Sequence, residues 1–280
     1  MIDLKNEEIR NAVRDRYGLI AREQTAGCGC GDACCAPAEK EGASSTDCGC
    51  SSACCTDSVS QSQALGYGIE QINLAPEGSN LGLGCGNPQA IAALKPGETV
   101  LDLGSGGGFD CFLAARSVGP QGRVVGVDMT YDMLSLARSN AVKGGYTNID
   151  FRLGEIEHLP VADATIDVIL SNCVINLSPD KPQVFREAFR VLKTGGRLAV
   201  SDMVASGPIP ESLKADLTLY SQCTTGAASV AALEEMLADA GFSQIRIQPK
   251  AESRTFVKDW APGTNIEEYI LSASIEAVKF

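Results

Sequence analysis

Cysteines are the residues in this chain whose number and spacing point most directly to chemistry. The sequence has 12 of them, and eight lie in two runs of the form C-x-C-x-x-x-C-C, at 28–35 and 48–55. Thiolates are soft ligands, and this crowded spacing differs from the separated C-x-x-C pairs of many zinc sites. Copper(I) or trivalent arsenic, which accept two or three thiolates, fit it better. Zinc, or a cysteine-rich linker without a ligand, are the alternatives. The possible soft-ion ligands are Cys28, Cys30, Cys34, Cys35, Cys48, Cys50, Cys54 and Cys55.

The other four cysteines lie in segments that are far apart in the sequence. Cys85 stands between two glycines, Cys173 follows a predicted strand, and Cys223 lies in a predicted helical insertion. These three thiols could converge on one site, although a free cysteine is more commonly a buried and inert small hydrophobe. Cys111, at the start of a predicted helix, is interpreted as a packing residue.

A glycine-rich stretch at Val100–Asp110 predicts a ligand pocket. It reads as a buried strand, a turn with Gly104 and Gly106, and a helix, and glycines there let the backbone approach a ligand closely. Asp128 ends the next predicted strand about 20 residues on, where an acid accepts hydrogen bonds from ribose hydroxyls. The D-x-G-x-G-x-G pattern resembles the first motif of class I S-adenosylmethionine-dependent methyltransferases. A dinucleotide site, or a tight turn without a ligand, are the alternatives.

Strands and helices are expected to alternate along the rest of the chain. Strands are predicted at 99–103, 123–128, 149–153, 165–171, 196–202, 244–248 and 271–278, and helices at 6–21, 110–118, 131–144 and 181–192. A short helix or turn is predicted at 64–71, and a helix-rich insertion at 210–224 and then 229–240. This order predicts an α/β, Rossmann-like fold, with a seven-stranded, mostly parallel sheet, an antiparallel last hairpin and helices on both faces. With the resemblance of the glycine motif, it implies a class I methyltransferase fold. We expect an N-terminal helix at 1–26, a cysteine-rich segment at 27–62 and the methyltransferase domain at 63–280.

The charge balance argues against a nucleic-acid partner. The 280 residues carry a formal net charge of −12, whereas nucleic-acid binding depends on basic surfaces. No apolar run is long enough to span a bilayer, and the charged N-terminus does not read as a signal peptide. We therefore expect a cytoplasmic protein without a membrane partner, in which thiols serve metal binding or catalysis.

Several stretches resemble the arsenite methyltransferase family. They are Leu81–Pro88, Val100–Cys111, Gly126–Thr130 and Ser171–Lys181, with support from Val191–Gly196, Ser201–Asp202 and Cys223. The asparagine–cysteine pair in Ser171–Lys181 is the most specific, because general methyltransferases do not share it. The resemblance implies that Cys85, Cys173 and Cys223 bind trivalent arsenic. The longer family members carry an additional C-terminal domain, and they use one N-terminal cysteine where this chain has eight.

The same pattern suggests which residues contact the cofactor. Asp102, Gly104, Ser105 and Gly106 would line its methionine end, Asp128 would bind the ribose, and Met129 would flank the adenine. The resemblance adds Glu155 and Ile156 at the adenine edge and Asn172 beside the sulfonium.

The expected reaction is methyl transfer from S-adenosylmethionine to thiolate-bound arsenic, as arsenic detoxification. Arsenite or its thiol conjugates would be the substrate. Arsenic(III) keeps a lone pair, so no general base is required, and we interpret the single histidine, His158, as a surface loop residue. A thiol reductant, thioredoxin or glutathione, would reopen any disulfide formed. The alternatives are a thiol-rich protein that sequesters soft metals on a methyltransferase scaffold, and a methyltransferase for another small acceptor.

Overall fold

A mixed β-sheet forms the centre of the molecule. Its strands follow the order β3-β2-β1-β4-β5-β8-β7. The sheet is parallel from β3 to β5, and β8 runs antiparallel to both of its neighbours. The strands are β1 Thr99–Leu103, β2 Arg123–Asp128, β3 Ile149–Leu153, β4 Ile166–Asn172, β5 Leu192–Ala205, β7 Ser243–Lys250 and β8 Ile270–Val278. The predicted fold class is confirmed, with one addition: β6 (Ala228–Ser229) pairs with β5 beside this path.

The computed structural model describes residues 4–26, 58–214 and 216–280. Both cysteine runs, and so all eight predicted soft-ion ligands, lie outside the described residues. The helix α2 (Ser58–Ala64) crosses the predicted boundary at residue 62, and the division of the chain into three parts stays a prediction.

Helices cover both faces of the sheet, as two separate cores show. The apolar stripe of α7 (Lys181–Val191) packs on one face together with α10 (Val230–Asp239). On the other face lie α4 (Gln89–Ala92), α5 (Phe109–Val118) and α6 (Tyr131–Gly144). This two-sided cover explains why the central strands are almost continuously apolar.

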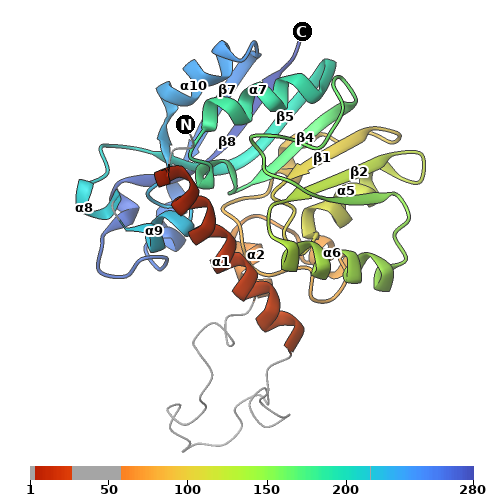
Figure 1. Cartoon of the computed structure of the whole chain (residues 1–280), viewed down its shortest axis with the longest axis horizontal. Coiled ribbons are helices and arrows are strands. Elements are labelled where there is room, and N and C mark those ends of the chain that lie inside the picture. The colour runs from red at the N-terminus through yellow and green to blue at the C-terminus, as the bar shows by residue number, and fades with distance from the viewer. Residues whose placement is uncertain (1–3, 27–57, 215) are drawn as a thin grey trace, which may run out of the picture.

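The N-terminal helix α1 (Leu4–Ala26) crosses the front of the molecule beside the ends of the parallel strands (Figure 1). It packs against α6, which follows β2 in the chain, and against α9 (Leu217–Ser221), which comes after β5. Ile9 and Val13 are buried, as the spacing of apolar residues predicts. An ion pair between Arg22 and Asp132 of α6 fastens the far end of the helix.

The structure resolves two segments whose form the sequence had left open. The short helix or turn predicted at 64–71 contains a turn, because Gly66, at a φ of 97°, ends α2 before α3 (Ile69–Leu74) begins. The predicted helix-rich insertion at 210–224 contains two short helices, α8 (Glu211–Lys214) and α9, and Asp216 caps the second through the backbone amides of Thr218 and Leu219.

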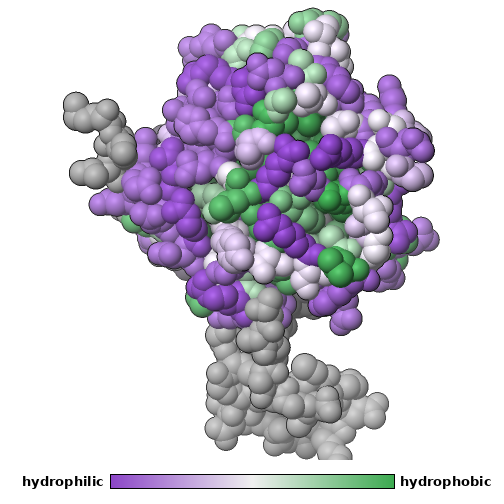
Figure 2. Space-filling view, turned by 45° about the vertical axis from the view of Figure 1, so that its right-hand side comes forward, coloured by the Kyte–Doolittle hydropathy of each residue, from purple (hydrophilic) through white to green (hydrophobic). Residues whose placement is uncertain are grey.

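One short element, η2 (Ile175–Leu177), lies between β4 and α7, and three more link β7 to β8. They are η3 (Ala251–Ser253), α11 (Arg254–Val257) and η4 (Ile266–Glu268). The face drawn in Figure 2 is mostly hydrophilic, with hydrophobic residues gathered near its middle. Within the described ranges, no helix is both long and apolar enough to cross a membrane.

Candidate active site

A cavity opens at the carboxyl edge of the sheet, between the glycine turn after β1 and the helix α1. Its empty volume is ≈ 1070 Å³, part of which is open solvent. Parallel strands direct their carboxyl ends to one edge, so the residues that end β1, β2 and β4 meet here. Of the predicted cofactor contacts, the lining includes Asp102, Gly104, Ser105, Gly106, Asp128, Met129, Ile156 and Asn172.

The glycine turn has the geometry that its sequence predicts. Gly104, Gly106 and Gly108 have φ values of 68°, 51° and 92°, in the left-handed region that L-residues with a side chain rarely adopt. The backbone amides of Gly104 and Ser105 donate to the carbonyl of Val127 at 2.8 and 3.0 Å, which ties the turn to β2. The Ser105 hydroxyl is buried and has no hydrogen-bond partner, so it is available to a ligand in the cavity.

Three aspartates line this cavity, of which Asp102 and Asp110 are buried and Asp128 is half-buried. Asp102 accepts a hydrogen bond from the Cys111 thiol at 3.2 Å. Asp128 accepts from the backbone amides of Gly106 at 2.9 Å and Thr130 at 2.8 Å. The Cys111 thiol is buried, as the packing interpretation predicts, and it also holds a cavity-lining carboxylate.

Asp110, the third acid, belongs to a hydrogen-bond network that the sequence did not reveal. The Tyr67 hydroxyl lies 2.9 Å from both carboxylate oxygens, and the side-chain amide of Gln89 donates at 3.3 Å. The only sequence signal was an acid in the first turn of the helix after the glycines. Tyr67 gave no signal, because it lies 43 positions from Asp110.

Burial raises the pKa of all three carboxyl groups. Desolvation is the largest cause in each case. The negative charge of Asp110 raises the pKa of Asp102 further, whereas the Tyr67 hydrogen bond opposes the rise for Asp110. The cavity therefore favours a ligand that brings positive charge.

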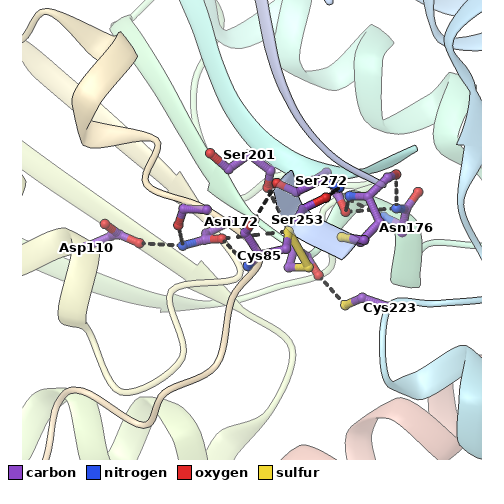
Figure 3. The surroundings of a disulfide bond; sticks show 12 residues. Cys85, Asp110, Asn172, Asn176, Ser201, Cys223, Ser253 and Ser272 are labelled. Atoms are coloured by element: carbon purple, nitrogen blue, oxygen red, sulfur yellow. Dashed lines mark hydrogen bonds between the residues drawn. A yellow bond between two sulfur atoms is a disulfide. The ribbon is translucent and has the colours of Figure 1, made fainter. Parts of the chain in front are cut away.

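The three predicted thiols come together at the other end of the cavity (Figure 3). Cys85 and Cys173 are joined as a disulfide with their Cα atoms 5.7 Å apart. The Cys223 thiol donates to the carbonyl of Cys173 at 2.6 Å. Cys173 itself lines the cavity, so the sulfur cluster adjoins the space available to a cofactor.

Two of these cysteines hold the backbone in an unusual conformation. Cys173 and Cys223 have φ values of 62° and 60°, which are uncommon for residues other than glycine. The amide of Cys173 donates to the carbonyl of Ser201 at 2.8 Å, and that of Cys223 to Tyr220 at 3.0 Å. Such conformations cluster at functional sites, where the surrounding structure maintains them.

Asn172 connects the thiols to the acid network. Its carboxamide oxygen accepts from the Cys85 amide at 3.1 Å. Its NH₂ group lies 3.0 Å from the Tyr67 hydroxyl and 2.9 Å from the carbonyl of Gly86. Figure 3 shows Asp110, Asn172 and Cys85 following one another, with Cys223 on the far side of the disulfide.

Another buried acid, Asp202, lies on the thiol side. Its carboxylate accepts from the Asn176 side chain and from the Met203 amide, each at 2.8 Å. Desolvation raises the pKa of Asp202 to about 6 despite these donors and the charge of Lys181. Burial, and then the charge of Asp202, also raises the pKa of the Cys223 thiol. The sequence had offered Asp202 only as part of the family resemblance.

The helix α1 covers the site, and its residues Arg10, Val13 and Tyr17 line the cavity. The Tyr17 hydroxyl lies 4.0 Å from the Cys223 sulfur. Glu155 forms ion pairs with Arg10 and Arg14, and it is not among the lining residues. Its predicted contact with adenine stays a prediction, whereas its neighbours Ile156 and Glu157 both line the cavity. His158 is exposed in the loop after β3, as predicted.

The fold and this acid-lined cavity define a class I methyltransferase. A family described as "Methyltransferase domain" matches residues 94–241. An arsenite methyltransferase of Halobacterium salinarum is 48% identical over 99% of this chain, which spans 68% of that protein. A human arsenite methyltransferase is 40% identical over 53% of this chain and 42% of its own length. The chain belongs to the arsenite methyltransferase family.

A solved structure agrees with this assignment. The arsenic(III) S-adenosylmethionine methyltransferase CrArsM of Chlamydomonas reinhardtii is 31% identical, with a TM-score of 0.59 over 80% of this chain and 74% of that one. A phosphoethanolamine N-methyltransferase of Haemonchus contortus, at 20% identity and a TM-score of 0.57, shares the fold.

The cavity fits S-adenosylmethionine, the cofactor of this class. Asp102, Asp110 and Asp128 supply three carboxyl groups to its lining, and the cofactor carries an ammonium and a sulfonium. The unpartnered Ser105 hydroxyl offers a further polar contact. The attraction between opposite charges is stronger inside a desolvated pocket than in water.

Replacing Gly104 tests the close packing of the turn. A Cβ atom there would lie 2.6 Å from the Val174 side chain, whereas one at Gly97 would meet nothing within 4 Å. Both positions have positive φ, so Gly97→Ala is a matched control for backbone strain. We expect Gly104→Ala to lower the free energy of unfolding by about 1–3 kcal/mol more than the control, and to weaken S-adenosylhomocysteine binding. Equal losses in urea titrations of both variants would contradict this account.

The buried acids also predict a pH dependence. A folded-state pKa above the unfolded value means that the ligand-free protein loses stability as pH rises through the raised pKa. The cofactor ammonium favours the ionised carboxylates, so binding should strengthen over the same range. We expect the thermal shift caused by S-adenosylhomocysteine to be larger at pH 8 than at pH 5.5, with a lower Kd by calorimetry. A Kd that does not change with pH would show that these acids do not face the ligand's charge.

Proposed function

We propose that this protein transfers a methyl group from S-adenosylmethionine to trivalent arsenic held by Cys85, Cys173 and Cys223. The observation that supports this most directly is that three thiols from distant segments meet where Cys173 lines the cofactor cavity. The family membership supports the same acceptor. We further propose that the reaction takes place in the cytoplasm and serves arsenic detoxification.

Positioning is the main contribution of the chain to the reaction. S-adenosylmethionine supplies an electrophilic methyl group, and arsenic bound by three thiolates keeps a lone pair. Because no proton leaves the arsenic, the side chains need not act as a base. Cys85, Cys173 and Cys223 are all buried, so the acceptor would be held away from water and aligned with the methyl group.

Disulfide formation would complete the reaction. The methylated arsenic is formally pentavalent, and two thiolates supply the two electrons that return it to the trivalent state while they form a disulfide. The pairing of Cys85 with Cys173 supports these two as the donors. An external dithiol or two thiols, as in thioredoxin or glutathione, would then reduce the bond and become oxidised in turn.

The direct test is a methylation assay. The purified chain is incubated with arsenite, S-adenosylmethionine and a thiol, and the arsenic species are separated by chromatography. We expect methylated arsenic to appear. If arsenic is bound stoichiometrically but never methylated, the chain is a thiol-rich sequestering protein instead.

A single substitution assigns the role of the thiols. We expect Cys173→Ser to slow arsenic methylation by about a hundredfold or more, because misplacement of a reacting group by 1 Å already costs that much. The affinity for S-adenosylhomocysteine, measured by calorimetry, should not change and serves as the internal control. Cys111 is not a suitable control, since its thiol contacts Asp102. Methylation by Cys173→Ser at the wild-type rate would rule out this ligand set.

A further inference from the structure

A carboxylate lies against two of the three thiols. One ligand atom each from Cys85, Cys173 and Asp202 falls within 4.8 Å of the others. The three residues are 1%, 7% and 2% exposed, so this group is almost closed to solvent. It comes from three separate segments, namely the loop before α4, the end of β4 and the middle of β5.

Asp202 is held in place but not neutralised. The Asn176 side chain and the Met203 backbone amide donate to one carboxylate oxygen. The backbone amide of Asn176 donates to the other oxygen at 3.3 Å. Among the described residues no cationic group forms an ion pair with it, because the Lys181 ammonium instead donates to the carbonyls of Asn176 and Ser178. A carboxylate has about four acceptor sites on its two oxygens, so room for a ligand remains beside these three hydrogen bonds.

Asp202 has no role in the proposed methyl transfer. Arsenic(III) is satisfied by three thiolates, and no base is needed. A donor set of two thiolates and one carboxylate matches a different kind of ion. Zinc-group cations accept both sulfur and oxygen, and three protein ligands with an open fourth position are a common arrangement.

We propose that, once the Cys85–Cys173 disulfide is reduced, Cys85, Cys173 and Asp202 bind a divalent zinc-group cation, Zn²⁺ or Cd²⁺. Reduction by a phosphine consumes one water, gives two thiols and converts the phosphine to its oxide. The cation then replaces the two thiol protons, which are released. Two thiolates and a carboxylate more than balance its double charge. The oxidised protein, whose sulfurs are bonded to each other, does not form this site.

One consequence rests on the proposed function. The cation and arsenite would share Cys85 and Cys173, so they could not occupy this site together. Asp202 would favour the divalent cation but would be dispensable for arsenic, which takes its third ligand from Cys223. Zinc would therefore compete with arsenite, and the strength of that competition would depend on Asp202.

Cadmium-113 NMR of the full chain, reduced with a phosphine, tests the site itself. The cadmium resonance moves downfield with each sulfur ligand, so a site with two sulfurs and an oxygen is distinguished from thiolate-only sites in the cysteine runs. A site with two sulfur ligands and one oxygen should give a resonance upfield of those from thiolate-only sites. We expect one resonance of this kind in the reduced wild type and none in the oxidised protein. It should be lost in Cys85→Ser and in Asp202→Asn, and retained in Asp239→Asn, whose aspartate is exposed on α10.

The outcomes separate this proposal from its alternatives. An unchanged resonance in a folded Cys85→Ser or Asp202→Asn variant, or no such resonance in the reduced wild type, would overturn it. Circular dichroism and S-adenosylhomocysteine binding check that each variant folds, and Cys85→Ser gives the answer if Asp202→Asn does not. None of these readouts requires methylation, so they stand even if the proposed function fails.

A kinetic measurement tests the competition. We expect Zn²⁺ to inhibit arsenic methylation competitively with arsenite, and Asp202→Asn to raise the inhibitory concentration about tenfold or more. The Asp239→Asn control should match the wild type. Equal zinc inhibition of the Asp202→Asn variant and the wild type would exclude Asp202 as a ligand.

Discussion

The hydrogen bonds of one carboxamide, that of Asn172, join the two halves of the site. Its NH₂ group lies within hydrogen-bond distance of the Tyr67 hydroxyl, the Asp110 carboxylate and the carbonyl of Gly86, and its oxygen accepts from the Cys85 amide. Because Asn172 ends β4 and Cys173 follows it, the position of the sheet edge sets the distance between the acids and the sulfurs. The alignment that methyl transfer requires is therefore built into the end of one strand.

Burial gives both halves their chemical character. The aspartates of the cofactor cavity are desolvated, which raises their pKa values and favours binding of a positively charged ligand. The thiols are equally removed from water, and burial raises the pKa of Cys223, so its thiolate forms most readily when a thiophilic atom replaces the proton. The helix α1 completes this enclosure from a part of the chain more than 200 positions away from Cys223.

The sequence predicted the parts of this site that depend on local pattern. The apolar run and the glycines from Val100 onward predict the strand and its turn. Cys173 follows a predicted parallel strand, and the carboxyl ends of parallel strands meet at one edge of the sheet, which places it at the site. Contacts between distant segments could not be predicted. The Cys85–Cys173 pairing spans 88 positions, and Asp202 reaches the thiols only because β5 lies beside β4. Glu155 was assigned to the cofactor, yet its carboxylate meets two arginines of a helix whose docking no local pattern encodes.

Arsenic K-edge X-ray absorption tests the central claim, that three converging thiols hold the acceptor beside the cofactor. The sample is the reduced chain with serine at all eight positions of the two cysteine runs, bound to one equivalent of arsenite and S-adenosylhomocysteine. The account predicts three sulfur neighbours and no oxygen, with one sulfur replaced by oxygen in a further Cys223→Ser variant. Arsenic that keeps oxygen neighbours in the parent protein, or a spectrum unchanged by Cys223→Ser, would contradict it.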